Sequence, residues 1–577
     1  MSPLKKHKYI FVIGGVMSGV GKGIATSSIG AILQSKGFKV NLMKIDPYLN
    51  VDAGTMNPTE HGEVFVLKSG LETDQDMGNY ERFLNRDLSA SDYMTSGMVY
   101  KAVIERERSL GYKGKFVEAI PHVTDEIRER IMHASSTSGS DISVIEIGGT
   151  IGDFQNELFI EAARVLKLKN PDDVIFILVS YLPVPGTIGE MKTRPTQNAI
   201  RQVNSYGVQP DIIIARGPQA LDHKRKEKIA LSCSVPVEHV ISAPDIETIY
   251  EVPVNFEKDN LSGILLNALR LRAIKKDGLA PWRKLVSRIK SLKDEVHIGI
   301  IGKYFDTGDF VLSDAYLSVI EAVKHSAYAL GKKPVMTWIN SKDFESGDKD
   351  VSMLKAFDGV VVPGGFGESG IEGKIKAIKY VRENKIPYFG LCYGMQLATI
   401  EYARHVAGLT GANTTEINPK TAYPVIDIMP EQKKHMAEGK YGATMRLGSY
   451  PCELKTGTIA FDAYNSSSSG DLTLNAIPRF PRDGEPVESK RSTLIHERHR
   501  HRYEVNPDYI AQIEKAGLVF SGKSPDGTLC EIAELPKNIH PFFLGTQFHP
   551  ELQSRPLVPH PLFTAFIKAS TQRSKST

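Results

Sequence analysis

A cysteine lies within a tight-turn motif in the second half of the chain. Gly390-Leu-Cys-Tyr-Gly394 has the G-x-C-x-G form of a nucleophile elbow, in which a strand leads through a sharp turn into a helix. The glycines relieve crowding around the turn, and the N-terminus of the helix favours a thiolate. We therefore expect Cys392 to be a nucleophile, with the neighbouring amide of Tyr393 serving an oxyanion hole.

A thiol nucleophile needs a base, and the base needs an acid that orients it. The segment Gln547-Phe-His-Pro-Glu551 supplies both, two residues apart. The glycine-rich stretch Val362–Gly367 also follows a predicted strand and is the expected source of a second oxyanion donor. A lone cysteine in apolar surroundings is more often structural. The elbow, the donor loop and the His-x-Glu pair together favour catalysis by Cys392, His549 and Glu551.

Near the N-terminus, the stretch Gly14–Gly23 follows a strand and opens a helix. Its glycines let backbone N–H groups approach phosphate oxygens, and Lys22 can reach the outer phosphates. The match to a P-loop is imperfect, because five residues separate Gly15 from Gly21 and Gly23 replaces the usual hydroxyl residue. A metal ion must therefore find other oxygen ligands. The alternative is a glycine-rich turn without a ligand.

Two carboxylates are candidates for that metal ion. Asp74 lies in Glu72-Thr-Asp-Gln-Asp76, and Glu146 lies inside an apolar strand that ends in glycines. A buried charge is costly unless it is paired or binds metal, and ligands gather at the carboxyl ends of parallel strands. The alternative for Glu146 is an ion pair with a nearby lysine or arginine.

A second group of polar residues follows later in the first half of the chain. Taken singly, each is a solvated surface charge, but beside a nucleotide site they become candidate ligands for a second polyphosphate. They are Lys192, Arg194, Gln197 and Lys228.

The stretch 495–502 alternates histidine and arginine, which invites interpretation as a metal site. A strand with one cationic face explains the alternation better. An arginine of such a face can grip an α-carboxylate in bidentate fashion.

Strand-length apolar runs alternate with amphipathic helical stretches along the chain, which predicts parallel sheets covered on both faces. We expect strands at Tyr9–Gly14, Lys39–Ile45, Ile142–Ile147, Val174–Ser180, Asp211–Ala215, Val296–Ile301, Gly359–Val362 and Pro387–Leu391. We expect helices at Lys22–Lys36, Ser313–Leu330, Ile371–Glu383 and Gly394–His405. The predicted organisation is a domain over 1–277, a helical linker over 278–295 and a second domain over 296–577. A loop-like insertion falls at about 465–488.

Composition limits the classes of protein that remain. The 577 residues carry a formal charge of +4, which by itself argues for neither nucleic acid nor membrane as a partner. No stretch approaches the roughly 20 apolar residues of a membrane span, and the N-terminal apolar run is too short for a signal peptide. The cysteines form no CxxC pair and no disulfide framework, which favours a reducing cytoplasm; they are Cys233, Cys392, Cys452 and Cys530.

These motifs together resemble the CTP synthase family, over about Lys8–Ser570. The matching segments are GGVMSGVGKG, MKIDPYLNVDAGTMNP, HGEVFV, ETDQD, EIGGTIGD, KTRPTQ, VPGGFG, GLCYGMQ, RHRHRYEV and QFHPEL. A more distant alternative is the cobyrinic or cobyric acid amide ligases, which also pair a synthetase half with a glutaminase half. The segments MKIDPYLNVDAGTMNP and HGEVFV favour CTP synthase.

The resemblance implies an N-terminal P-loop-type synthetase domain and a C-terminal class I glutamine amidotransferase domain, both doubly wound α/β. It implies that ATP phosphorylates the C4 oxygen of UTP, and that ammonia freed from glutamine at Cys392 travels inside the protein and displaces the phosphate. It implies Mg²⁺ on Asp74 and Glu146 and places His61 near the ammonia path. ATP contacts are implied for Gly19, Val20, Gly21, Lys22, Gly23, Lys44, Asp74 and Asp245. UTP or CTP contacts are implied for Ser18, Asp153, Phe154, Gln155, Lys192, Thr193, Arg194, Pro195, Thr196, Gln197 and Lys228. Glutamine contacts are implied for Gly365, Tyr393, Gly394, Met395, Gln396, Glu416 and Arg502.

The resemblance further implies a homotetramer, filaments, activation by GTP and inhibition by CTP. Family members usually carry a glutamate where this chain has Gln155, in the inhibitory CTP pocket, so we predict weakened or altered CTP inhibition. Tyr393 replaces a common leucine, with little expected effect on its amide. A catalytically silent scaffold is the alternative from another class. Such a protein should have lost Cys392, Lys22 or a carboxylate, and this chain retains all of them.

Overall fold

The computed structural model describes residues 7–574 apart from 187–188, 303–312, 366, 369, 430–431, 433–441 and 467–492. The chain divides into two compact units. The first combines the residues up to Asp52 with Asn79–Ser287, and the second combines Ala53–Gly78 with the chain from Arg288 onward. Most of the predicted insertion at 465–488 lies outside the described residues, which stop at Ser466 and resume at Thr493.

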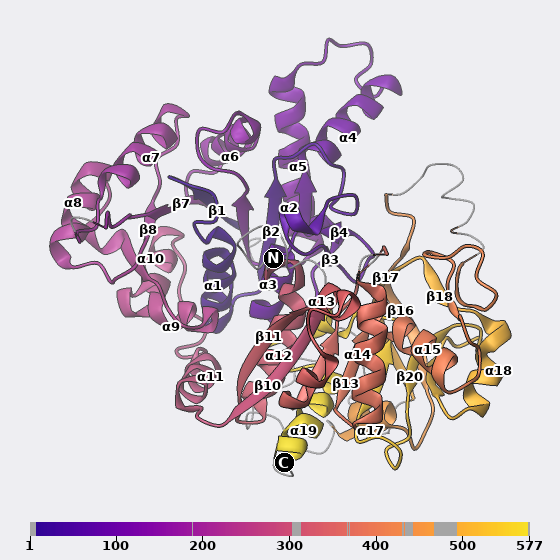
Figure 1. Ribbon diagram of the computed structural model, residues 1–577. Coiled ribbons are helices and arrows are strands. Elements are labelled where there is room, and N and C mark those ends of the chain that lie inside the picture. Colours follow the sequence, from indigo (N-terminus) through magenta and orange to yellow (C-terminus); the bar gives the residue numbers. More distant parts are fainter. Residues whose placement is uncertain are drawn as a thin grey trace. The chain divides into compact units, whose positions relative to one another are not determined.

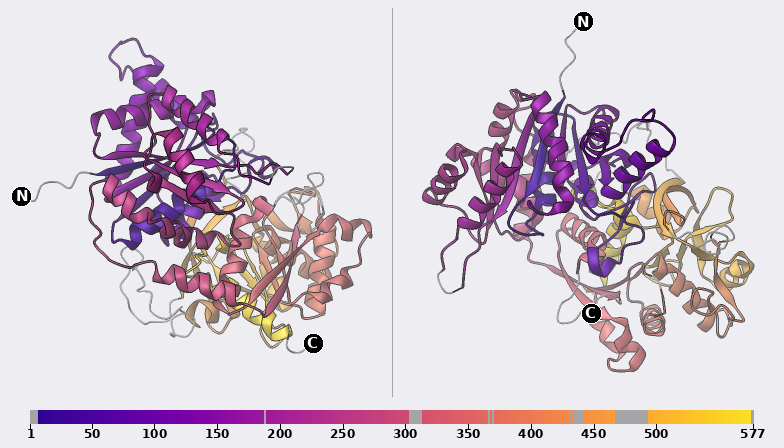
Figure 2. Two further views of the ribbon diagram at one scale, coloured as in Figure 1. Left: turned by 90° about the vertical axis from the view of Figure 1, so that its left-hand side faces the viewer. Right: turned by 90° about the horizontal axis from the view of Figure 1, so that it is seen from above.

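Seven described strands of the first unit form one parallel sheet in the order β5-β2-β6-β1-β7-β8-β9. They are β1 (Lys8–Gly14), β2 (Val40–Asp46), β5 (Tyr93–Thr95), β6 (Ile142–Ile147), β7 (Val174–Tyr181), β8 (Ile212–Gly217) and β9 (Val240–Pro244). The residues of β1 and β6 are all buried, as expected for strands covered on both faces. Figures 1 and 2 show helices on both faces of this sheet.

The helices of this unit follow the predicted alternation with strands. They are α1 (Lys22–Ser35), α4 (Ser96–Arg108), α5 (Thr124–Thr137), α6 (Glu157–Lys169), α7 (Arg194–Ser205), α8 (His223–Cys233), α9 (Val252–Phe256) and α10 (Leu261–Ala268); α3 (Asp76–Leu84) and α11 (Ala280–Ser291) cross the boundaries of the unit. Helix α1 begins after Gly21, whose φ is 89°, and ends before Gly37, whose φ is 96°. Both are left-handed conformations that glycine adopts readily. Helix α11 lies within the predicted helical linker.

Nine described strands of the second unit form a sheet in the order β11-β10-β12-β13-β21-β20-β19-β16-β17. They are β10 (Glu295–Gly302), β11 (Lys333–Asn340), β12 (Gly359–Val362), β13 (Tyr388–Leu391), β16 (Arg446–Leu454), β17 (Leu494–His501), β19 (Val519–Lys523), β20 (Cys530–Glu534) and β21 (Phe543–Thr546). Strands β11 to β21 in this order are parallel, and the next four pair antiparallel. The second sheet is therefore parallel in its first part and antiparallel beyond it.

Both faces of this second sheet are apolar. Val361 and Phe389 pack in one core cluster, whereas their neighbours Val360, Val362 and Tyr388 pack in another. Successive strand residues point to opposite faces, so the two clusters are the two sides of the sheet. The covering helices are α12 (Leu317–Ala329), α13 (Ser341–Ser346), α14 (Ile371–Glu383), α15 (Tyr393–His405), α17 (Ile459–Ser466), α18 (Pro507–Lys515) and α19 (Pro561–Ser574).

Smaller elements complete the second unit. A sheet of β14 (Asn413–Thr414), β15 (Pro424–Ile428) and β18 (Tyr503–Val505) lies beside the large one, and Ala53–Gly78 contributes α2 (Pro58–His61) and the hairpin of β3 (Phe65–Val66) and β4 (Glu72–Thr73). None of the helices that the structure describes is long and apolar enough to cross a membrane.

The segment Ala53–Gly78 packs on the far edge of the large sheet, although it precedes that sheet by hundreds of residues. The amide of Ser449 donates to Lys68 O at 3.1 Å, and Arg498 Nη1 donates to Val66 O at 3.1 Å. The sequence predicts this segment as part of the first domain, because no local pattern separates it from its neighbours. The contacts assign it to the compact unit that carries Cys392.

Candidate active sites

Cys392 occupies the turn between β13 and α15. Its φ of 49° and ψ of −98° are strained for a residue with a side chain. A Cβ on Gly390 would lie 2.7 Å from the carbonyl carbon of Gly394, and one on Gly394 would lie 2.2 Å from Val362 O. The turn therefore requires glycine on both sides of the cysteine, as the elbow motif predicts.

His549 lies directly before the short helix η9 (Pro550–Gln553), and its Nδ1 is 2.7 Å from Glu551 Oε1. A Cβ on Gly364 would lie 2.9 Å from His549 Cε1 and 3.8 Å from Cys392 Cβ, so both side chains border this glycine of the donor loop. Burial lowers the pKa of His549, but Glu551 and then Cys392 outweigh burial and raise that pKa well above its ordinary value. The arrangement suits a thiolate–imidazolium pair.

The predicted glutamine contacts lie on several elements of the second unit. Glu416 Oε1 accepts from the amide of Gly367 at 2.9 Å, next to Gly365 in the donor loop. Gln396, on the first turn of α15 with Tyr393, Gly394 and Met395, is buried. Arg502 lies between β17 and β18, and its Nη1 donates to Gln432 Oε1 at 2.7 Å and Thr444 Oγ1 at 2.9 Å.

The predicted cationic face of the stretch 495–502 is present on β17. Arg498 is buried over the ring of Phe65, 5.5 Å from its centroid, and Arg500 Nε donates to Glu72 Oε1 at 2.8 Å. These two arginines therefore contact the segment Ala53–Gly78, Arg498 from a buried position and Arg500 from a partly exposed one. No group of three or more potential metal ligands occurs among the described residues, in this strand or elsewhere.

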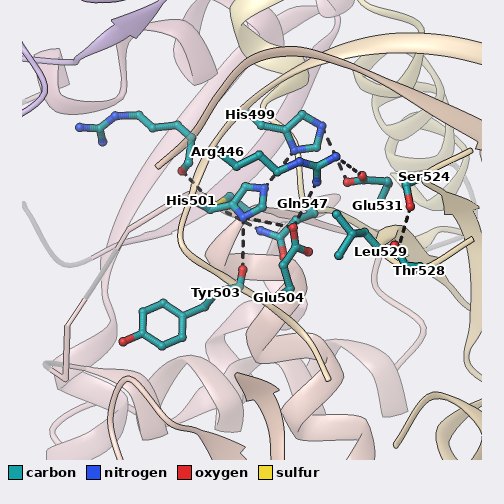
Figure 3. Close-up of polar contacts among 12 residues, drawn as sticks. Arg446, His499, His501, Tyr503, Glu504, Ser524, Thr528, Leu529, Glu531 and Gln547 are labelled. Atoms are coloured by element: carbon teal, nitrogen blue, oxygen red, sulfur yellow. Dashed lines mark hydrogen bonds and ion pairs between the residues drawn. The ribbon is translucent and has the colours of Figure 1, made fainter. Parts of the chain in front are cut away.

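The opposite face of β17 carries a buried polar cluster that sequence reasoning missed (Figure 3). Arg446 donates to Glu504 Oε1 at 3.1 Å and to Glu531 Oε1 at 2.7 Å. His499 Nδ1 lies 3.0 Å from His501 Nε2, and His499 Nε2 lies 3.7 Å from Glu531 Oε2. Burial lowers the pKa values of both histidines well below their ordinary value, which favours the neutral form of each. Arg446 and Glu531 come from strands whose relation to β17 no local pattern reveals.

In the first unit, the glycine-rich stretch surrounds Lys22. Lys22 Nζ donates to Gly149 O at 2.7 Å, and a Cβ on Gly14 would lie 2.7 Å from the same nitrogen. Gly19 and Gly21 have φ of 69° and 89°. Ser18 and Val20 lie in the same loop, and Gly23 lies in the first turn of α1. The loop therefore places its amides and Lys22 at the start of α1, at the carboxyl end of β1.

Glu146 is fully buried beside Lys44, its partner in the pairing of β2 with β6. Lys44 Nζ lies 2.9 Å from Glu146 Oε1 and 3.6 Å from Asp46 Oδ1, and Tyr80 Oη donates to Glu146 Oε2 at 2.5 Å. The ion pair that sequence reasoning weighed against metal binding is thus present. Asp74 belongs to the other compact unit, where its Oδ1 accepts from the amide of Asp76 at 2.8 Å, and His61 ends α2 in that same unit.

The predicted second polyphosphate site gathers around the start of α7. Thr193 precedes the helix, Arg194 and Pro195 begin it, and Thr196 Oγ1 accepts from Ser180 Oγ at 2.8 Å. Gln197 Nε2 donates to Thr193 Oγ1 at 3.2 Å, and Lys192 Nζ lies 3.0 Å from Glu190 Oε2.

The remaining predicted nucleotide contacts lie on nearby loops and on α8. Phe154 and Gln155 are exposed in the short helix η3 (Phe154–Asn156), and Asp153 Oδ2 accepts from the amide of Thr150 at 2.7 Å. Lys228 lies on α8. Asp245 Oδ1 lies 3.3 Å from Arg216 Nη2, and a Cβ on Gly21 would lie 3.0 Å from Arg216 Nη1. Arg216 therefore links Asp245 to the phosphate loop, a connection that sequence reasoning did not find.

Comparison with known proteins covers both halves. The family model described as CTP synthase N-terminus matches residues 8–271, and the model described as glutamine amidotransferase class-I matches residues 311–569. A CTP synthase of Thermococcus gammatolerans is 47% identical over 568 residues, which cover 98% of this chain and 99% of that protein. The chain belongs to the CTP synthase family.

A second CTP synthase shows similar agreement. That of Methanococcoides burtonii is 46% identical over 569 residues, covering 98% of this chain and 99% of the relative. A solved glutaminase domain of a Trypanosoma brucei CTPS with bound acivicin is 33% identical, with a TM-score of 0.40, and covers 48% of this chain and 94% of that one. Because the matches to these two curated CTP synthases cover 98% of the chain, the synthetase and amidotransferase halves belong to one enzyme, a ligase.

Proposed function

We propose that the protein converts UTP to CTP, with ATP as the phosphoryl donor and glutamine as the source of ammonia. The observation that carries the proposal is the nucleophile elbow at Cys392, with the hydrogen-bonded pair His549 and Glu551 in the same compact unit. The other unit of the chain contains the predicted phosphate-binding loop. Membership of the CTP synthase family supports the pairing of these two chemistries.

In the glutaminase reaction, the Cys392 thiolate attacks the amide carbon of glutamine. His549, held at Nδ1 by Glu551, has taken the thiol proton and passes it to the leaving ammonia. The amide of Tyr393 and the loop containing Gly365 stabilise the oxyanion. Water then attacks the thioester, with His549 as base, and releases glutamate. Gln396, Glu416 and Arg502 hold the substrate, with Arg502 on its carboxylate.

In the synthetase reaction, the C4 oxygen of UTP attacks the γ-phosphorus of ATP, and ADP leaves as the bond from the γ-phosphorus to the bridging oxygen breaks. The C4 oxygen, a poor leaving group, is thereby converted into a phosphate ester that can leave as phosphate. Lys22 and Lys44 stabilise the charge that develops on the phosphoryl oxygens. Carboxylate oxygens are the hard ligands that Mg²⁺ prefers, so Asp74 and Glu146 would hold the ion. The bound ion would neutralise charge on the phosphates of ATP. Lys44 Nζ donates a hydrogen bond to Glu146 Oε1. Ammonia that travels inside the protein then attacks C4 and displaces phosphate.

The finer parts of the proposal rest on resemblance to the family. They include UTP contacts around Lys192–Gln197 and Lys228, a homotetramer that can form filaments, activation by GTP, inhibition by CTP and a cytoplasmic location. We also propose a synthetase domain over 1–277, a linker over 278–295 and an amidotransferase domain over 296–577.

The test is a spectrophotometric assay of UTP to CTP conversion with ATP and Mg²⁺, supplied with either glutamine or ammonia. Cys392→Ala should abolish the use of glutamine and leave the use of ammonia intact. Loss of both activities in a folded variant would contradict the two-site scheme, and a wild-type protein that makes no CTP would refute the proposal. Cys452→Ala is the matched control, since Cys452 is a buried cysteine of the same unit outside the site.

A further inference from the structure

The side chain of Gln547 lies against the sulfur of the nucleophile. Its Nε2 is 3.6 Å from Cys392 Sγ, within the range of an N–H···S hydrogen bond. Gln547 is fully buried and follows β21 directly, with its backbone amide donating to Glu531 O at 2.8 Å. In the sequence, this residue is the first of the segment Gln547–Glu551, and no pattern there predicts a role for it.

The backbone carbonyl of Tyr503 fixes the orientation of the Gln547 amide through Gln396, because a carbonyl oxygen only accepts hydrogen bonds. Tyr503 O lies 2.9 Å from Gln396 Nε2, so that atom of Gln396 must be the amide nitrogen. The same nitrogen lies 3.2 Å from Gln547 Oε1, which therefore accepts. This leaves the NH₂ group of Gln547 facing Cys392 Sγ.

A second hydrogen bond strengthens this anchor. His501 Nδ1 lies 3.2 Å from the same Tyr503 O, and the carbonyl has two lone pairs to accept both bonds. The Tyr503 carbonyl is therefore fully occupied by Gln396 and His501. A flip of the Gln396 amide would set two oxygens against each other at 2.9 Å, which disfavours any other orientation of the chain of amides.

We propose that Gln547 is a further catalytic residue of the glutaminase reaction, whose side-chain N–H donates to Cys392 Sγ and stabilises the thiolate. The proposal rests on the proposed glutamine hydrolysis. A neutral donor stabilises an anionic sulfur more than a thiol, because charge-assisted hydrogen bonds are about twice as strong. The same contact favours departure of the thiolate when water cleaves the thioester. Gln547 itself gains and loses no proton.

The reactivity of the thiol measures this contact directly. Alkylation by iodoacetamide requires the thiolate, and the other cysteines are poor competitors. Burial raises the pKa of Cys233 to about 11 and that of Cys530 to about 12, and it also raises the pKa of Cys452. At neutral pH the fast-alkylating cysteine of the native full-length protein is therefore Cys392, and Cys392→Ala supplies the blank.

Two variants with side chains of nearly the same volume as glutamine distinguish the effect of the N–H donor from the effect of packing. Gln547→Met removes the donor, and Gln547→Glu replaces it with an acceptor that repels the thiolate while keeping an oxygen for Gln396. We expect the midpoint of the alkylation rate plotted against pH to move up by about one pH unit in Gln547→Met, the tenfold scale of one charge-assisted hydrogen bond, and still further in Gln547→Glu. Glutamine-dependent CTP synthesis should fall in the same order, and ammonia-dependent synthesis should stay at the wild-type rate.

Gln512→Met is the matched control, because Gln512 is an exposed glutamine of the same unit that donates to Ala407 O. Retained ammonia-dependent synthesis, or an unchanged melting temperature, shows that each variant is folded. A midpoint that does not move in folded Gln547→Met, or equal midpoints in the Met and Glu variants, would overturn the proposal. If the wild type makes no CTP, the proposed function fails, yet the alkylation series still decides the role of Gln547.

Discussion

Arg500 Nε donates to Glu72 Oε1 at 2.8 Å, across 428 residues of sequence. The same arginine places its carbonyl oxygen 3.9 Å from Cys392 Sγ. Arg500 of β17 therefore contacts the segment Ala53–Gly78 through its side chain and the nucleophile through its carbonyl oxygen. The carboxylate of Glu72 is buried, and removing one partner of a buried ion pair is costly because the other charge stays buried.

Glu72→Gln should accordingly disturb glutamine hydrolysis. We expect glutamine-dependent CTP synthesis to fall about tenfold, the scale of one charge-assisted hydrogen bond beside the site. Ammonia-dependent synthesis should fall less, because it bypasses Cys392. The two rates are compared in one assay with Glu60→Gln, an exposed glutamate of the same segment, as the control. Equal loss with both nitrogen sources would contradict this coupling.

Lys22→Ala should impair the synthetase reaction and spare glutamine hydrolysis, the reverse of the pattern expected for Glu72→Gln. Because Lys22 lies at the start of α1 within the phosphate loop, its loss should lower CTP formation at least about a hundredfold with either nitrogen source. Basal glutamine hydrolysis, measured as glutamate released without nucleotides, should be unchanged. Lys39→Ala, at an exposed lysine of the same unit, should leave both activities intact. CTP formation at the wild-type rate in Lys22→Ala would exclude the proposed role.

The buried cluster on β17 predicts a pH dependence of stability. Burial raises the pKa of Glu504 well above its ordinary value, with Glu531 adding to the shift and Arg446 opposing it. Burial also raises the pKa of Glu531, against Arg446. A carboxyl whose pKa is higher in the folded state gives its full stabilisation below the unfolded pKa of about 4.3. That stabilisation is lost as pH rises through the folded pKa.

Glu504→Gln cannot titrate, so it should gain thermal stability relative to wild type as pH rises from about 5 to about 8. His499 and His501 face the same cluster, but burial lowers both pKa values, so their titration adds stability as pH rises and is common to both proteins. The measurement is the melting temperature of each protein across that range. A difference that is independent of pH would refute the assignment of the titration to this cluster. Arg446→Met, which leaves two carboxyls without their cation, should melt lower at every pH.

Gln155→Glu tests whether the glutamine at this position, where family members usually carry glutamate, alters inhibition by CTP. Gln155 is exposed in η3, where its amide can donate and a carboxylate can accept. If this position belongs to an inhibitory CTP pocket, the glutamate variant should show an inhibition curve for CTP that shifts to lower concentration by several-fold, about the effect of one hydrogen bond. The curve is measured with saturating ATP and glutamine. A curve that does not move would mean that Gln155 has no part in inhibition.

Local patterns in the sequence predicted much of the fold and the outline of the site. Strands β6 and β12 and helix α14 have the predicted bounds, because a strand covered on both faces must be a continuous apolar run and a surface helix must be amphipathic. The elbow at Cys392 and the pair His549–Glu551 could be predicted for the same reason. The glycines around the strained turn and the two-residue spacing of the pair are local features of the sequence.

The tertiary structure decided what depends on long-range pairing. It placed Ala53–Gly78 on the sheet that carries Cys392, added four antiparallel strands to a sheet expected to be parallel, and joined Arg446 to Glu504 and Glu531. It also turned Gln547 toward the sulfur of Cys392. The physical reason is the same in each case. Apolar periodicity identifies a buried face, but the partner of a buried polar group is set by the register and packing of strands that lie far apart in sequence.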